Sequence, residues 1–313
     1  MRGDCDSSTT INQFHKSNIA YVSNNCPLSF YKMFLKLARL PRRPFISLRN
    51  STSKRFETTV THQPDATSDS RWLGTIKARI GKCIMFGMSR EQARDAGKIL
   101  EVLGRDWREL LAGRHGYLVD KKRAGLSRHK VVWGEMDCMK HVNNVMYVRY
   151  AESARVNWAQ NYAVHIDPQN QEKWRRMCTP EGYGMIMKSI KTTYLFPMTW
   201  PDHISVYHKL AHKPQSKDEF SFKLDVLIVS ELHQRAAARC EEDIVTYDYI
   251  KGKREGLQPW LLDAFAKTWE EQNAAMNNAL RKIKDIEEKV RKLEVDTWDR
   301  ADAVEDMGTP KKT

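Results

Sequence analysis

Residues 131–155, VVWGEMDCMKHVNNVMYVRYAESAR, constrain the fold more than any other stretch of the chain. A strand-like run ends in Asp137, and a short turn with the sequence HVNN follows it. The helical pattern over 145–162 carries small alanines among tyrosines and a tryptophan. Because small residues let a sheet approach closely while aromatic rings fill volume, we expect this helix to be wrapped by a sheet rather than to lie on a surface.

Five runs have strand character, and only the first precedes the helical pattern. They cover 128–137, 185–196, 203–212, 219–230 and 234–249. In the fourth run, alternate positions are apolar and are expected on one face of a sheet, namely Phe220, Phe222, Leu224, Val226 and Ile228. Short connections between the last four runs predict an antiparallel meander. The core is therefore expected to contain one strand, a long helix and four more strands.

Helical patterns flank this core on both sides. The segment from Arg71 to about Gly113 predicts two helices divided near Gly87, and Ser89 and Gln92 have the spacing of a capping box. Apolar side chains then recur at helical spacing at Ile99, Leu100, Leu103, Trp107, Leu110 and Leu111. We expect an accessory helical layer here, over 71–126.

The chain is helical again beyond Pro259. Apolar residues recur at spacings of three or four among Lys, Arg and Glu, at Leu280, Ile283, Ile286, Val290 and Leu293. A short coiled coil and a helix docked on the domain both fit a run of about two heptads. The expected organisation is thus a core domain over 127–250 and a C-terminal helical extension over 251–313.

The first 60 residues form a basic segment. They contain ten Lys or Arg and three Asp or Glu, a net charge of 10 − 3 = +7 out of +13 for the whole chain. Basic, apolar and hydroxyl side chains without acids between Ser7 and Phe56 are typical of a mitochondrial transit peptide, and a disordered basic tail is the alternative. We expect a matrix protein, with residues 61–70 as a polar linker. No apolar run reaches the roughly 18 residues of a membrane span.

Charge and cysteine content narrow the classes of partner. The remaining residues carry a net charge of only 13 − 7 = +6, which suits an anionic substrate such as a CoA ester, and no nucleic-acid-binding motif accompanies it. Cysteines 5, 26, 83, 138, 178 and 240 form no CxxC pair, so reduced thiols are expected. His203 would point to the opposite strand face from His208 and His212, so we expect no metal and no cofactor.

The stretch WGEMDCMKHVNNVMYVRYAESARVNW resembles the signature of the 4-hydroxybenzoyl-CoA thioesterase-like branch of the hot-dog fold superfamily. The matching positions are Asp137, His141, Asn143, Asn144, Tyr147, Tyr150, Glu152, Ala154 and Arg155. The resemblance covers roughly 128–250 and implies an α+β hot-dog fold, an antiparallel sheet wrapped around one central helix. It also implies a homo-oligomer, a dimer or tetramer, with sites between subunits, and hydrolysis of acyl-CoA or another acyl thioester.

The chemistry of these residues suits a thioester carbonyl. Asp137 is expected to attack the carbonyl or to activate water. Backbone N–H groups of the helix that starts near Asn144 and Val145 would polarise the carbonyl oxygen, and Asn143 or Asn144 would cap that helix. His141 would bind the carbonyl or orient the turn. Asp137 also fits a purely structural Asx-type turn, and His141 and Asn143 also fit a role in fixing the loop.

Other polar residues of the motif have competing interpretations. Glu152 fits a carboxylate buried in the helix and paired with Arg155 or Arg149, and it is the second candidate base. Cys138 would need a basic neighbour to act as a nucleophile. Lys140 stands where the family usually has a small residue, often Gly, and would either contact a CoA phosphate or block the site.

Three functions compete. The first is a mitochondrial acyl-CoA thioesterase. The second is a non-catalytic hot-dog protein whose helical extensions dock in a larger mitochondrial assembly. The third is a hydratase or dehydratase of the same fold, which would carry an Asp-to-His segment of a spacing that this sequence lacks.

Overall fold

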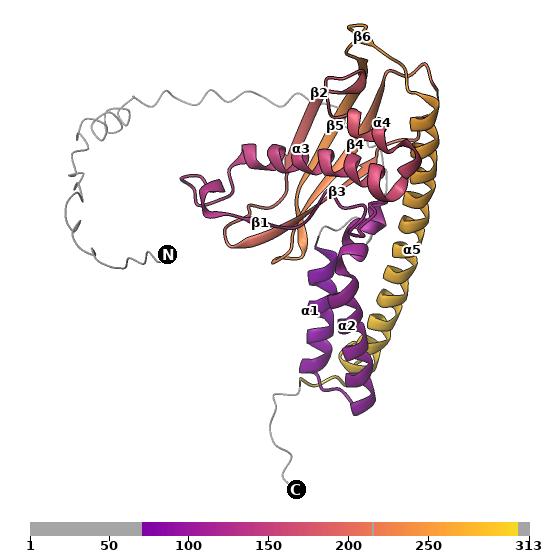
Figure 1. Ribbon diagram of the computed structural model, residues 1–313. Coiled ribbons are helices and arrows are strands. Elements are labelled where there is room, and N and C mark those ends of the chain that lie inside the picture. Colours follow the sequence, from indigo (N-terminus) through magenta and orange to yellow (C-terminus); the bar gives the residue numbers. More distant parts are fainter. Residues whose placement is uncertain (1–70, 215, 306–313) are drawn as a thin grey trace, which may run out of the picture. The chain divides into compact units, whose positions relative to one another are not determined.

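The computed structural model describes residues 71–214 and 216–305 of the 313-residue chain. The predicted transit peptide over 1–60 and the linker over 61–70 lie outside the described residues. The helices are α1 (Trp72–Met85), α2 (Arg90–Ala112), α3 (Asn144–Asn161), α4 (Gln171–Arg176) and α5 (Pro259–Thr297). The strands are β1 (Leu126–Val131), β2 (Tyr183–Tyr194), β3 (Asp202–Leu210), β4 (Ser221–Ser230), β5 (Arg235–Asp248) and β6 (Lys253–Arg254). Figure 1 follows them along the chain.

One antiparallel sheet has the strand order β1-β3-β4-β5-β2, and the short β6 pairs with the end of β5. The predicted meander is correct for β3, β4 and β5 and wrong for β2, which pairs with β5 instead of β3. The connection 195–201 passes the ends of two intervening strands, a distance of about 14 Å that a chain of this length spans easily. A short connection therefore did not require neighbouring strands.

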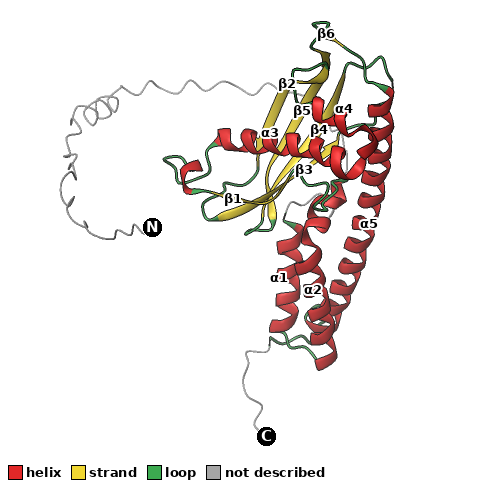
Figure 2. Cartoon of the chain, viewed as in Figure 1, coloured by secondary structure: helices red, strands yellow, loops and turns green. Residues whose placement is uncertain are grey.

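Helix α3 lies against one face of this sheet, as Figure 2 shows. Its inner face is buried and consists of Tyr147, Tyr150, Ala151, Ala154, Trp158 and Ala159. The approach is close enough that a Cβ placed on Gly125, just before β1, would lie 2.4 Å from the Ala154 carbonyl oxygen. The structure confirms the α+β class and the hot-dog arrangement, a sheet wrapped around one central helix.

Strand β4 separates two apolar layers. Phe222, Leu224, Val226 and Ile228 pack on the α3 side, as their period predicts, whereas Leu227 and Val229 on the other face join the core of the helical extensions. Phe220 departs from the prediction: it precedes β4 and is 48% exposed.

The helical extensions pack together as α1, α2 and α5. Their shared core contains Ile76, Ile80, Ile99, Leu103, Trp107, Leu110, Ile283, Ile286, Val290 and Leu293. The run after Pro259 is thus a helix docked within its own chain. The Ser89 hydroxyl accepts from the Gln92 N–H at 3.2 Å and the Gln92 side chain accepts from the Ser89 N–H at 2.8 Å, which confirms the capping box.

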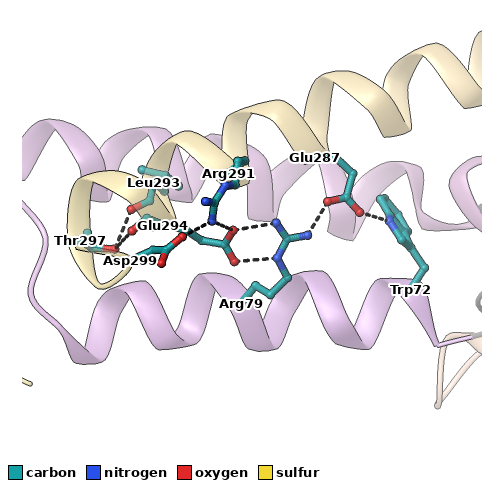
Figure 3. Close-up of polar contacts among 8 residues, drawn as sticks. All are labelled: Trp72, Arg79, Glu287, Arg291, Leu293, Glu294, Thr297 and Asp299. Atoms are coloured by element: carbon teal, nitrogen blue, oxygen red, sulfur yellow. Dashed lines mark hydrogen bonds and ion pairs between the residues drawn. The ribbon is translucent and has the colours of Figure 1, made fainter. Parts of the chain in front are cut away.

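An ion-pair network fastens α1 to α5 (Figure 3). The Arg79 guanidinium donates to both carboxylate oxygens of Glu294, at 2.7 and 2.9 Å, and also to Glu287. The Trp72 indole N–H donates to the other oxygen of Glu287 at 2.6 Å. Because the Glu294 side chain is only 5% exposed, this ion pair stabilises the packing of α1 against α5 rather than being a solvated surface pair.

None of the described helices is long and apolar enough to cross a membrane.

Candidate active site

The chain between β1 and α3 is a compact loop. The strand predicted over 128–137 ends earlier, at Val131, and a single 3-10 turn over Trp133–Glu135 follows it. Met136 and Val142 then form an isolated antiparallel bridge. Inside it, the Asp137 N–H donates to the His141 carbonyl at 2.8 Å. These bonds hold residues 137–141 directly in front of α3.

Asp137 has one structural and one available carboxylate oxygen. Its Oδ1 accepts from the Met139 N–H at 2.8 Å and from the His141 N–H at 3.4 Å, so the Asx-type turn is present. Its Oδ2 has no hydrogen-bond or ion-pair partner among residues 71–214 and 216–305. The side chain is half-buried. The turn therefore fixes the carboxylate while leaving one oxygen for a substrate or a water.

The N-terminus of α3 lies immediately after this loop. Asn143 is the N-cap, and its Oδ1 accepts from the Val145 N–H at 3.1 Å. The Asn144 N–H has no acceptor within the described part of the chain, while its carbonyl accepts from the Tyr194 hydroxyl at 3.1 Å. Asn144 and Val145 in the first turn are solvent-exposed, and the turn contains no acidic residue. It can therefore present a backbone donor and the positive end of the helix dipole to an oxyanion.

Two side chains of the loop remain without polar partners in the described structure. His141 is half-buried, and the exposed Lys140 directs its ammonium group to no described acid. Lys140 has a φ of 62°, a left-handed conformation that glycine adopts without cost. This explains why a related motif would carry glycine here, and it leaves the lysine side chain outside the loop's own hydrogen bonds.

Glu152 is not the buried, paired carboxylate that the sequence suggested. It is exposed, and no described residue forms a hydrogen bond or ion pair with it. Ala151 and Ala154 face the sheet, so the intervening residue 152 points outward. Arg155 pairs instead with Glu242 of β5, at 2.7 Å. Arg149 and the free thiol of Cys138 are also exposed.

Glu135, which was not singled out in the sequence, supports the loop together with two tyrosines of the motif, Tyr150 and Tyr147. Glu135 accepts from the Val132 N–H at 2.8 Å and from the Tyr150 hydroxyl at 2.7 Å. Burial, and then the contact with Glu135, raise the pKa of Tyr150 well above its usual range, so the phenol stays protonated and donates. The Tyr147 hydroxyl accepts from the Met198 N–H at 3.3 Å. The motif tyrosines thus anchor the loop and the connection 195–201.

A buried polar cluster lies further along α3. Glu242 bonds to Arg155, and its other oxygen lies 3.8 Å from Nε2 of His208 on β3. Burial raises the pKa of Glu242 to about 7 and lowers that of His208 to about 3. His208 is thus a neutral core residue. The period-two pattern of β5 was the available signal, because Glu242 alternates with the buried Cys240 and Ile244 on one face of the strand.

Apolar side chains surround the candidate site on the surface. Trp133 is 68% exposed, Met139 70% and Val145 67%. Trp133 packs edge-to-face against Trp200, with ring centroids 5.5 Å apart. The described residues contain no group of three or more His, Cys, Asp or Glu side chains placed to hold a metal ion. The chemistry available at this loop is that of a carboxylate, an imidazole and backbone N–H groups.

Comparisons with known proteins found similarity over the hot-dog domain. A family model described as the thioesterase-like superfamily matches residues 131–265, less than half of the chain. A thioesterase from Thermus thermophilus, solved with coenzyme A and zinc, is 19% identical, with 46% of this chain and 92% of that chain covered and a TM-score of 0.36. A DHNA-CoA thioesterase from Staphylococcus aureus is 13% identical, with 48% and 90% covered and a TM-score of 0.35. No curated protein matches the chain. The hot-dog domain of this protein is therefore similar, over residues 131–265, to the thioesterase-like superfamily.

Proposed function

We propose that the hot-dog domain hydrolyses acyl thioesters, with acyl-CoA or an acyl carrier protein as the substrate. One observation carries the proposal. The available oxygen of Asp137 and the Asn144 N–H lie on one continuous loop-to-helix segment, inside the region that matches the thioesterase-like superfamily. The match to the 4-hydroxybenzoyl-CoA thioesterase-like motif supports the same reaction.

The proposed mechanism uses the residues of this segment. Asp137 takes a proton from water as the water attacks the thioester carbonyl, or attacks the carbonyl itself and is regenerated by water. The Asn144 N–H and the α3 dipole stabilise the oxyanion. The carbon–sulfur bond then breaks, and the thiolate takes up a proton to give a free acid and a thiol. His141 orients the carbonyl, and Lys140 contacts a phosphate of CoA.

The proposal includes a homo-oligomer, a dimer or tetramer. The Asp137 loop is an open surface bordered by exposed Trp133, Met139 and Val145, and β2 is an edge strand of the sheet. A second copy that covers these apolar side chains would also close the site against water.

The basic composition of residues 1–60 supports a location in the mitochondrial matrix, which import of the full chain into isolated mitochondria would test.

Hydrolysis of a panel of thioesters by the purified full chain tests the function. Short, medium, long and aromatic acyl-CoA esters and an acyl carrier protein ester should be compared by thiol release. We expect turnover of at least one of them, and turnover should fall strongly in Asp137→Ala. The absence of turnover on every ester, from a folded and oligomeric protein, would contradict the proposal.

One observation favours a docking function as a second candidate. A groove of about 610 Å³ lies between α2 and α5, remote from the Asp137 loop. Its apolar floor is Ile99, Val102, Ile286 and Leu293, and charged side chains line its rims. A partner that binds this groove should be lost from pull-downs when Val102→Glu is introduced, while Asp137→Ala should leave such binding intact.

A further inference from the structure

A small pocket between α1 and the β4–β5 turn has an unusual charge composition. Its volume is about 260 Å³, and its lining consists of Arg71, Leu73, Gly74, Lys77, His233, Gln234 and Arg235. Three of these residues carry positive charge, one is a histidine, and none is acidic. The pocket is formed by the helical extension together with the sheet, so it is separate from the Asp137 loop.

Two of its cations have no carboxylate partner among residues 71–214 and 216–305. The Lys77 ammonium contacts the Gln234 side-chain oxygen at 2.5 Å. The Arg235 guanidinium lies over the Phe196 ring, 4.3 Å from its centroid, and its Nε is buried without a hydrogen-bond partner in that part of the chain. Burying the Nε without a hydrogen-bond partner is costly, and an anion that meets the terminal nitrogens of the guanidinium group in the pocket would stabilise its charge.

Four other partly buried arginines of the described structure have carboxylate partners. Arg79, Arg108, Arg123 and Arg155 each form an ion pair with a glutamate. Arg114, which is buried, instead donates to the His115 ring at 3.2 Å. Arg235 differs from these four because its guanidinium group stacks on Phe196 and forms no ion pair with a carboxylate of the described residues.

The acids of a neighbouring pocket are already engaged. Asp202 and Glu231 line a neighbouring pocket that also contains Gln234. Asp202 accepts from the Ser230 hydroxyl at 2.6 Å and from the Leu232 N–H at 3.1 Å. Glu231 accepts from Arg108 at 3.0 Å and from the Ser205 hydroxyl at 2.5 Å. Neither carboxylate is free to neutralise the cations of the pocket.

The backbone around the pocket adds to its positive character. Leu73 and Gly74 belong to the first turn of α1, which contains no acidic residue, so the positive end of the helix dipole adjoins the same space. No heavy atom lies within 4 Å of the point where a Cβ of Gly74 would be. Gln234 has a φ of 49°, a strained conformation for a residue with a side chain, and it orients its amide toward Lys77.

We propose that this pocket binds a phosphate group, either as the free ion or as a phosphate monoester, through Lys77 and Arg235. Arg235 offers a planar fork of donors and Lys77 a compact charge, a pairing suited to a tetrahedral dianion. The Gln234 amide group and the first turn of α1 complete the donor set. This inference does not depend on the thioesterase proposal, because it uses none of the residues of the Asp137 loop.

Titration of the full chain with inorganic phosphate, at constant ionic strength set with chloride, tests the site. We expect saturable binding by calorimetry and a rise in Tm beyond that given by chloride. Lys77→Gln and Arg235→Gln should each weaken the affinity about tenfold or more, as loss of one charge-assisted bond implies. Lys98→Gln removes the same charge from an exposed position of α2 and should leave the affinity unchanged.

The source of the phosphate is distinguished by a second ligand. Adenosine 3′-monophosphate that binds much more tightly than inorganic phosphate would identify an esterified phosphate, and equal affinities would identify the free ion. Arg235→Lys retains the charge and controls for any loss of folding in Arg235→Gln. Binding that is absent, or that is equal in the wild type, Lys77→Gln and Arg235→Gln, would overturn the proposal, the latter result indicating an adventitious ion only.

Discussion

The Glu242 carboxylate on β5 accepts a hydrogen bond from Arg155 of α3 at 2.7 Å, in the interior of the interface between the central helix and the sheet. Its second oxygen lies 3.8 Å from His208, and both of these side chains are fully buried. Two groups with strongly displaced pKa values therefore lie beside the helix that carries the candidate site. Their effects on stability have opposite signs.

The first prediction concerns the pH dependence of stability. The pKa of Glu242 is raised from 4.5 to about 7, so the folded state binds more protons between these values and the free energy of unfolding falls as pH rises. The pKa of His208 is lowered from 6.5 to about 3, so stability rises with pH over that window. The two effects oppose each other where the windows overlap.

Glu242→Gln should remove the decrease in the free energy of unfolding that the Glu242 carboxyl causes as pH rises. Urea unfolding between pH 4.5 and 7 should then show a free energy that rises to about pH 6.5 and no longer declines, with a difference from wild type on the order of 1–3 kcal/mol across the window. Glu241→Gln, on the same strand but exposed and paired with Lys191, serves as the control. Parallel pH profiles for the wild type and Glu242→Gln would show that the buried carboxyl does not titrate as described.

The second prediction concerns the tie between α1 and α5. Arg79→Met removes the bonds to Glu294 and Glu287 and leaves the nearly buried Glu294 carboxylate without its main partner (Figure 3). We expect a loss of about 2–4 kcal/mol in the free energy of unfolding. Arg105→Met removes an exposed guanidinium that pairs with Asp106 and should cost much less than Arg79→Met. Similar losses in both variants would contradict a structural role for the network.

The third prediction concerns the closest approach of α3 to the chain before β1. In Gly125→Ala, the added Cβ would lie 2.4 Å from the Ala154 carbonyl oxygen and 2.7 Å from the Ala154 Cβ, so backbone must shift. We expect a destabilisation of about 2–4 kcal/mol, seen as a lower Tm. Gly97→Ala in α2, where no atom lies within 4 Å of the new Cβ, should instead stabilise by about 1 kcal/mol. An unchanged Tm in Gly125→Ala would show that α3 and the segment before β1 are further apart.

The fourth prediction separates the charge of Lys140 from its backbone conformation. Lys140→Ala removes the ammonium group and keeps the strained φ of 62°, whereas Lys140→Gly removes both. If Lys140 contacts a CoA phosphate, both variants should raise KM about three- to tenfold with little change in kcat. Only Lys140→Gly should also stabilise the fold, by up to about 1 kcal/mol. An unchanged KM in both variants would exclude the phosphate contact.

Local patterns predicted much of this structure. The capping box at Ser89, the helix after Asn143 and the buried alternate positions of β4 all follow from interactions within a few residues. The hot-dog arrangement was predicted from the resemblance of the motif around Asp137 to a known family. The capping box, the helix and the alternation are encoded by short-range geometry, so one sequence suffices to identify them.

The features that sequence reasoning missed depend on contacts between distant segments. Strand β2 pairs with β5, and the short connection 195–201 between β2 and β3 does not determine which strand β2 pairs with. Glu242 lies on the buried face of β5, but its pairing with Arg155 of α3 is a contact between distant segments that no local pattern records. Glu152 was predicted to be buried but lies on the outer face of α3. The motif gives the spacing of its residues but not which side of the helix faces the sheet.

The most direct measurement of the central claim is kcat/KM for thioester hydrolysis by Asp137→Asn. An asparagine can still accept the Met139 and His141 N–H bonds, so the turn should persist while the anionic oxygen is lost. Asp120→Asn, in another turn where the aspartate accepts a backbone N–H, is the matched control. We predict a fall of at least about 100-fold for Asp137→Asn and none for Asp120→Asn. Equal activity in both variants would contradict the assignment of Asp137 as the reacting carboxylate.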